Sequence, residues 1–405
     1  MTSLWQNREF NLLWVSQSLS DLGGAIAQIA VPLLVLELTH SPVRAGVVGT
    51  GALIVKLAAR LPSGVLADRV DRRRAMLACD LIRLLAFLAL AVAVAAGRLT
   101  LGVIILVAVL DAACTAVFNT VEHAALRSIV PRGQLPAAVA RNDARSYSAW
   151  LAGPPLGGLL FGISHALPFL GNALSYLVSL TGVALIRRPL QAERDERPPG
   201  HAAALAEGLR FVFGNPFLRA VLIITAPLNF ALNGAIFTII VTLQRQGVQP
   251  GVIGLTETIV AVGGLAGAFV APLLRPWLPL PRLIRFICWA AAGVLVASAW
   301  LTASVAAAIP VSLAVFLGPS CNAALFGYQA AITPDHLQGR VLSVILLAAM
   351  SASAAAPLLS GLFVTAWGPA RTILVFAASV AVAALTATLA AGIRTMRPIE
   401  EAAPT

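Results

Sequence analysis

Asp21 and Asp111 are acidic residues near the middle of long apolar stretches. A charge at the centre of a bilayer costs at least about 2.5–3.5 kcal/mol, so it needs a partner or a water-filled cavity. A carboxylate in such a place can bind and release a proton as its surroundings change, and we expect both residues to act in proton coupling. The alternative is a structural ion pair with a cation of another apolar stretch: Lys56, Arg60 or Arg83.

Other charged residues suggest structural roles. Asp80 and Arg83 are three residues apart, which allows them to pair on one helix face. A second group surrounds the polar end of the stretch that contains Asp111: Glu122, His123, Arg127, Arg141, Asp143 and Arg145. We expect a charge network at the cytoplasmic surface there. A hydrolytic site is not expected, because no second histidine is nearby in sequence and no nucleophile motif is present.

Candidate substrate contacts are polar and aromatic residues within the apolar stretches. They are Gln28, Asn229, Asn233, Phe237, Asn322 and Gln329. Asn229, Asn233 and Phe237 are spaced by four residues, which puts them on one helix face. Asn322 and Gln329 are seven residues apart and also share a face. Hydrogen bonding between helices is the alternative for each of them. Around them, Ala, Leu, Ile and Phe dominate, which favours a lipophilic substrate.

The composition identifies an integral membrane protein. Hydrophobic residues make up 59% of the 405 residues and charged residues 11%, whereas soluble proteins have roughly 25% charged residues. The mean hydropathy is +0.88. The four cysteines lie in apolar stretches without metal-ligand spacing, so we expect small buried side chains, no metal and no cofactor.

Twelve stretches are long enough to cross a bilayer as helices, for which about 20 residues are needed. We therefore predict an all-α membrane protein of twelve transmembrane helices in two pseudo-symmetric six-helix halves. The predicted spans are 10–37, 43–66, 74–96, 100–126, 140–163, 166–186, 217–243, 251–274, 282–303, 307–332, 340–366 and 369–393.

The distribution of basic residues predicts the orientation. If the N-terminus is cytoplasmic, 21 of the 28 Lys and Arg residues lie on the cytoplasmic side, four lie outside and three lie within spans. This bias places both termini in the cytoplasm. It also explains the net charge of +11 by membrane topology, without a nucleic-acid partner.

The polar segment after the sixth span divides the chain. We predict an N-terminal half over 1–187, a cytoplasmic linker over 188–215, a C-terminal half over 216–396 and a tail over 397–405. Within the linker, 202–213 has an apolar face of Leu205, Leu209 and Val212. That pattern is typical of a short helix lying on the inner membrane surface.

The two halves resemble each other in sequence. Six residues of the first half recur 202 positions later: Leu135, Val139, Pro155, Leu156, Leu160 and Phe161 correspond to Leu337, Val341, Pro357, Leu358, Leu362 and Phe363. A duplicated helical unit whose halves face a midplane cavity is typical of secondary transporters.

The loop between the second and third spans has an acid among arginines. It resembles motif A of the major facilitator superfamily, G-x-x-x-D-R-x-G-R-R, at Gly64, Asp68, Arg69, Arg72 and Arg73, with Asp71 in place of the second glycine. The resemblance implies a cytoplasmic gate in which Asp68 pairs with Arg72 and faces the start of the span that begins near Arg340.

The fifth span contains a second motif. Gly153, Pro154, Gly157 and Gly158 match G-P-x-x-G-G, which resembles motif C of the antiporters in that superfamily. The same residues also suit close helix packing, for which Gly263 and Gly267 of the eighth span are the expected partners. The resemblance implies export rather than import.

The whole chain resembles the superfamily branch of the enterobactin exporter and macrolide-efflux-type proteins. Four segments carry this likeness: 20–36, 125–131, 207–211 and 339–341. We therefore expect a monomeric bacterial inner-membrane exporter of a small hydrophobic or amphipathic compound, driven by proton antiport with alternating access. Its partners would be that small molecule, protons and the lipid bilayer. The alternatives are an importer or facilitator of the same fold and, less favoured, a membrane-embedded enzyme.

Overall fold

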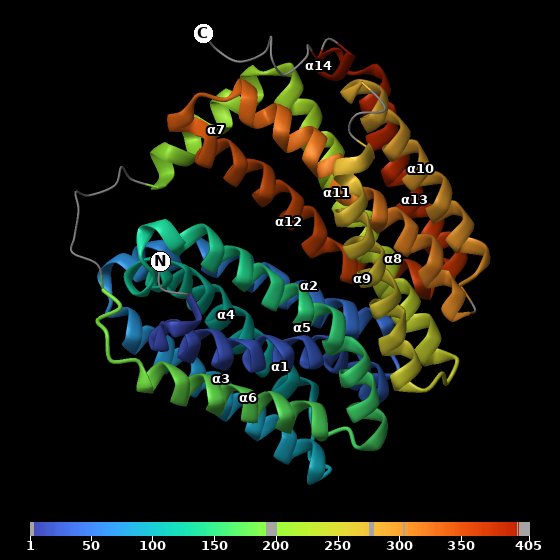
Figure 1. The fold of residues 1–405 in the computed structure, drawn as a ribbon. Helices are drawn as coiled ribbons and strands as arrows, with labels where there is room; N and C mark the ends of the chain where they lie inside the picture. Colours follow the sequence, from blue (N-terminus) through green and yellow to red (C-terminus); the bar gives the residue numbers. More distant parts are fainter. Residues whose placement is uncertain (1–3, 192–200, 275–278, 303, 395, 397–405) are drawn as a thin grey trace. The chain divides into compact units, whose positions relative to one another are not determined.

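The described part of the chain is helical throughout. The computed structural model describes residues 4–191, 201–274, 279–302, 304–394 and 396, without the side chains of 61, 64–69, 132, 201–205, 274 and 335–336. The described residues form helices and no strand (Figure 1), so the predicted all-α class is confirmed.

The helices before the linker are α1 (Arg8–Thr39), α2 (Pro42–Arg69), α3 (Arg72–Ala95), α4 (Leu101–Ile129), α5 (Leu135–Ile163) and α6 (Leu167–Leu185). Those after it are α7 (His201–Gly214), α8 (Pro216–Arg245), α9 (Pro250–Leu274), α10 (Leu280–Trp300), α11 (Ala308–Ile332), α12 (Asp335–Trp367), α13 (Pro369–Leu389) and α14 (Ala391–Arg394). Short 3₁₀ turns cover Leu4–Gln6, Arg132–Gln134 and Val305–Ala307.

Eleven of these helices, as far as they are described, are long and apolar enough to cross a membrane. They correspond to eleven of the twelve predicted spans. The remaining predicted span is α5, whose polar first half and internal Pro154 and Pro155 lower its mean hydropathy. With 29 residues, it is still longer than the bilayer requires.

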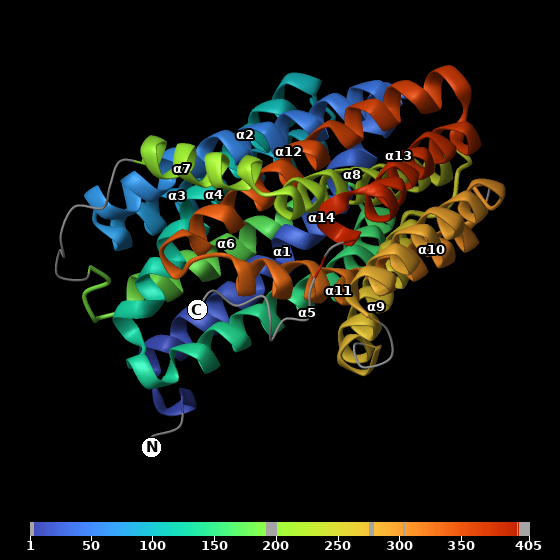
Figure 2. The same ribbon diagram turned by 90° about the horizontal axis from the view of Figure 1, so that it is seen from above.

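Contacts divide the chain into two compact units. The first unit contains residues 1–195 and 247–258, and the second contains 196–246 and 259–405. The pairings α1–α5, α1–α6, α3–α4 and α3–α6 of the first unit recur in the second as α8–α12, α8–α13, α10–α11 and α10–α13. Figure 2 shows α10 beside α13. The recurrence agrees with the internal sequence repeat.

The cysteines follow the same repeat. Cys79 of α3 lies beside Cys114 of α4, and Cys288 of α10 lies beside Cys321 of α11. All four thiols are free and buried. Their expected role as small buried side chains is therefore confirmed.

The helix predicted within the linker is α7. Its Val212 is fully buried in the core of the second unit, with Leu209 and Phe211 packed against that core. Gly208 lies against the backbone of Arg340, and Glu207 forms an ion pair with the same arginine. The helix α7 thus packs on α12 and α8. Its expected position on the inner membrane surface stays a prediction. The linker residues 192–200 lie outside the described part.

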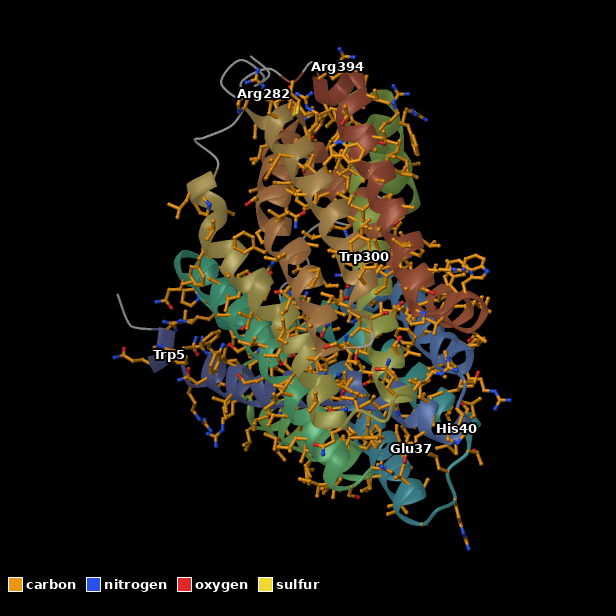
Figure 3. The ribbon with its side chains drawn as sticks, turned by 90° about the vertical axis from the view of Figure 1, so that its right-hand side faces the viewer. Trp5, Glu37, His40, Arg282, Trp300 and Arg394 are labelled. Atoms are coloured by element: carbon orange, nitrogen blue, oxygen red, sulfur yellow. The ribbon has the colours of Figure 1, made fainter. Side chains whose placement is uncertain are left out.

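Figure 3 shows which labelled residues lie at the ends of each unit. In the second unit, Arg282 and Arg394 lie together at one end, and Trp300 lies away from them along α10 (Figure 3). In the first unit, Trp5 lies at one end of α1, and Glu37 and His40 lie at the other.

Candidate functional site

Arg145 of α5 joins two acids in the first unit. Its Nε donates to Asp21 Oδ2 at 2.8 Å, and its Nη2 donates to Glu122 Oε1 at 3.1 Å. Ser146 Oγ also donates to Asp21, at 3.3 Å. The side chains of Arg145 and Glu122 are buried, whereas that of Asp21 is 30% exposed. We call these four residues the Arg145 cluster; it links α1, α4 and α5.

Asp21 therefore has a cationic partner that the sequence did not reveal. The alternative considered for it was a pair with Lys56, Arg60 or Arg83, but the observed partner is Arg145. Arg145 had been placed among cytoplasmic basic residues. Its pairing with Glu122 confirms part of the expected charge network, and Arg141 instead lies over the ring of Trp5, 4.4 Å from its centroid.

The pair of Asp80 and Arg83 forms as the spacing predicted. Both side chains are buried, and their ion pair lies within α3. Ser179 Oγ of α6 donates to Asp80 Oδ2 at 2.6 Å, and Gln17 Nε2 of α1 donates to Ser179 Oγ at 2.6 Å. The Asp80 carboxylate is thus bound on both oxygens, as a structural ion pair requires.

Arg83 also connects this pair to Asp111. Its guanidinium lies over the rings of Phe118 and Tyr176, 4.7 and 4.4 Å from their centroids. The Tyr176 hydroxyl donates to Asp111 Oδ1 at 2.9 Å. We call Asp80, Arg83, Tyr176 and Asp111 the Arg83 cluster, whose members come from α3, α4 and α6.

The two predicted proton-coupling residues therefore have different surroundings. Asp21 contacts a guanidinium directly, whereas Asp111 accepts a hydrogen bond from a neutral hydroxyl. The cations that act on Asp111 electrostatically are Arg83 and Lys56. Arg83 is itself paired with Asp80.

The described residues of motif A tie helix ends together. Arg72 donates to the carbonyls of Leu190 and Ala124 at 3.0 and 3.3 Å and to Ser128 Oγ at 3.4 Å. Arg73 donates to the Ala184 carbonyl at the end of α6. Ala184 lies in the last turn of α6, where helix carbonyl groups carry partial negative charge that the Arg73 side chain neutralises.

Asp71, the departure from the motif, has a clear local role. It is the N-cap residue of α3, and its Oδ1 accepts the Arg74 amide at 2.9 Å. Its φ of −57° needs no glycine. Gly64, Asp68 and Arg69 lie on the last turns of α2, and the prediction for their side chains falls outside the described residues.

Motif C lies at a three-helix contact in the first unit. Gly153 and Gly157 of α5 face Ala25 and Ile26 of α1 so closely that a Cβ on Gly157 would come within 2.6 Å of the Ile26 carbonyl oxygen. Gly158 lies against the Pro250 carbonyl at the start of α9. We call Gly153, Gly157 and Gly158 the α5 glycine face.

The second side of this contact is formed by the first turns of α9. Gly254 lies against the Pro154 carbonyl, and Thr258 Oγ1 donates to the Leu151 carbonyl at 3.4 Å. The prediction that Gly263 and Gly267 pack against the α5 glycine face is wrong, because they lie against Ser312 and Phe316 of α11. A helix turns by 100° per residue, so glycines nine or more residues further along α9 reach a different neighbour.

The candidate substrate contacts fall into two groups. Gln28, Asn229, Asn233 and Asn322 are exposed. Phe237 and Gln329 are buried, and Gln329 Nε2 donates to Thr333 Oγ1 at 3.1 Å. Asn233 Nδ2 lies 3.4 Å from Ser353 Oγ of α12, the hydrogen bond between helices that was the alternative reading.

Sequence reasoning missed several partners in these clusters. Tyr176, Ser179 and Gln17 were not singled out, although a tyrosine within an apolar span needs a hydrogen-bond partner. Arg145 was expected in the cytoplasmic charge network, but its ion pair with Asp21 was not predicted. Among the described residues, no group of three or more His, Cys, Asp or Glu side chains is placed to hold a metal ion.

Comparison with known proteins identifies the family. The model of the family described as "Transmembrane secretion effector" matches residues 2–404. The multidrug efflux pump Tap of Mycobacterium tuberculosis is 26% identical over 387 residues, which cover 90% of this chain and 89% of Tap. Macrolide efflux protein A of Streptococcus pyogenes is 25% identical over 346 residues, covering 83% and 84%.

Solved structures agree on the fold. A bacterial homologue of the human lysosomal transporter Spinster, in an inward-facing and unoccupied conformation, matches with a TM-score of 0.75 at 15% identity and covers all of both chains. A bacterial homologue of the iron transporter ferroportin matches with a TM-score of 0.71 at 18% identity, covering 96% of this chain and 99% of that one.

Proposed function

We propose that this chain exports a small hydrophobic or amphipathic compound, because it belongs to the transmembrane secretion effector family of major facilitator transporters. Its membership makes it a multi-pass membrane transporter that acts on a small molecule. The finer proposal is efflux across the bacterial inner membrane by proton antiport with alternating access. Both termini would lie in the cytoplasm, and the working unit would be a monomer.

The observation that carries the direction of transport is the α5 glycine face. Its three glycines match the antiporter motif, and a Cβ at any of them would overlap with α1 or α9. A contact of this kind leaves no space for water between the helices, so it suits a seal between the two sides of the membrane. The efflux proteins Tap and macrolide efflux protein A are similar along most of this chain, which supports the same direction.

The Arg83 cluster supports proton coupling. Asp111 lies in α4, its hydrogen bond comes from the neutral Tyr176 hydroxyl, and Arg83 is shared with Asp80. Such a carboxylate changes its protonation when the surrounding charges or water change. Asp21 is the second candidate, held by Arg145 in this conformation.

Accumulation in cells tests the export proposal. A bacterial strain that lacks its own efflux pumps is loaded with a macrolide or with the dye ethidium, with and without this chain. We expect cells that express the chain to retain less of at least one probe, and to lose that difference when a protonophore is added. Higher retention in the expressing cells would indicate import and overturn the proposal.

A further inference from the structure

Glu257 is an acid of α9 for which the description so far has no role. It lies two turns into the helix, on the segment 247–258 that belongs to the first unit. The side chain is partly buried. No hydrogen bond or ion pair to it is found in the described part of the chain.

This isolation separates Glu257 from the other acids within spans. Four other acids within spans each accept a hydrogen bond from a neighbouring side chain: Asp21, Asp80, Asp111 and Glu122. An ionised carboxylate without such a partner is costly in an apolar setting, because nothing replaces the water that it loses. In the packed state described here, the neutral carboxyl is the favoured form.

The neighbouring residues do not supply a donor. Thr256 Oγ1 donates to the Ile253 carbonyl at 2.6 Å, and Thr258 Oγ1 donates to the Leu151 carbonyl of α5 at 3.4 Å. Both hydroxyl protons are thus used by backbone groups. On α5, the groups that contact the residues on either side of Glu257 are Leu151, which meets Thr258, and Pro154, which meets Gly254; neither is titratable.

The position of Glu257 connects it to the seal. Gly254, one turn earlier, lies against the Pro154 carbonyl, and Thr258 follows directly after Glu257. Within α9, residues 250–258 belong to the first unit and residues 259–274 belong to the second. Any step that parts α9 from α5 therefore changes the surroundings of this carboxyl from packed side chains to water.

We infer that Glu257 exchanges a proton as α9 leaves and rejoins α5, and so acts as a further coupling residue of the antiporter. When the helices part, the carboxyl gives its proton to water and becomes a hydrated carboxylate. When they pack again, it takes a proton from water. This inference rests on the proposed proton antiport, and it adds a residue at the α5–α9 contact to the candidates in α1 and α4.

Labelling with dicyclohexylcarbodiimide tests the protonation directly. This apolar reagent adds to protonated carboxyl groups in apolar settings, and the adduct is located by mass spectrometry of peptides from the full-length protein in membranes. We expect an adduct on Glu257 at neutral pH, decreasing as the pH rises, with little on the ion-paired Asp80 and Glu122. Equal labelling of all three, or none on Glu257, would overturn the inference.

Transport by variants tests the role. Accumulation of the probe is measured in everted vesicles that contain either the wild-type protein or a variant. Glu257→Gln should reduce the gradient-driven accumulation about tenfold or more relative to the wild type. Glu257→Asp should restore part of it. Glu37→Gln is the matched control, since Glu37 is a half-exposed acid paired with His165 at the end of α1.

The possible failures are distinguishable. If the wild-type accumulation depends on the gradient and Glu257→Gln keeps that dependence, the role of Glu257 is wrong and the antiport proposal stands. If the wild-type accumulation does not depend on the gradient, the antiport proposal itself is wrong, and the coupling role of Glu257 fails with it.

Discussion

Asp111 differs from Asp21 in the group that holds it, and this difference predicts the effect of neutralising each. Asp111→Asn removes a proton site and the acid that lies near Lys56, while Arg83 keeps its ion pair with Asp80. We expect gradient-driven export to fall by about tenfold or more, which corresponds to about 1.4 kcal/mol or more. The measurement is the initial rate of probe transport in everted vesicles, normalised to the inserted protein.

Asp21→Asn should cost less than Asp111→Asn, because Arg145 keeps its pair with Glu122. The exposed Asp143 on α5 provides a control, Asp143→Asn, which should transport like the wild type. Full activity in both the Asp111 and Asp21 variants would remove these residues from the mechanism.

A second prediction at the residue scale concerns the N-cap of α3. Asp71→Ala removes the acceptor of the Arg74 amide and should lower the free energy of unfolding by about 1 kcal/mol. Asp71→Asn keeps an acceptor and should lower it much less. Thermal unfolding of the purified protein in detergent compares the two variants. An equal loss in both would show that the charge, and not the cap, stabilises this end of α3.

At the scale of helices, the α5 glycine face predicts a steric effect. Gly157→Leu would push a side chain into the Ile26 backbone and the Ile29 side chain of α1. Overpacking of this kind costs about 1–3 kcal/mol, so we expect coupled transport to fall about tenfold while the protein still inserts.

The matched control is Gly162→Leu on the same helix. Gly162 is exposed, and a Cβ there meets its nearest neighbour, Pro250, at 4.0 Å. Transport by this variant should remain close to that of the wild type. Intact coupled export by Gly157→Leu would mean that the motif match on α5 has no mechanical role.

Sequence patterns predicted the helices well but not their contacts. Apolar length placed the spans, since a bilayer fixes how long a helix must be. The thickness of the bilayer does not determine where a helix begins outside the membrane. For this reason α5 and α12 each begin five residues earlier than predicted, at Leu135 and Asp335. The short spacing of Asp80 and Arg83 predicted their pair, whereas the 124 residues between Asp21 and Arg145 gave no such signal.

For the whole molecule, the basic residues predict an orientation. An exposed arginine on each side allows a test by labelling: Arg98 follows α3 and Arg188 follows α6. With an impermeant maleimide on intact cells, Arg98→Cys should react and Arg188→Cys should react only after permeabilisation. The four native cysteines are buried and should contribute little background. The reverse pattern would invert the topology.

The exchange of drug for protons is the central claim, and one measurement in everted vesicles tests it most directly. The vesicles contain this chain, and respiration acidifies their interior, which quenches a pH-sensitive dye. The account predicts that adding a transported macrolide or dye releases protons and restores fluorescence while the compound accumulates inside, and that Asp111→Asn abolishes both. Accumulation that continues unchanged after the pH gradient is collapsed would contradict the account.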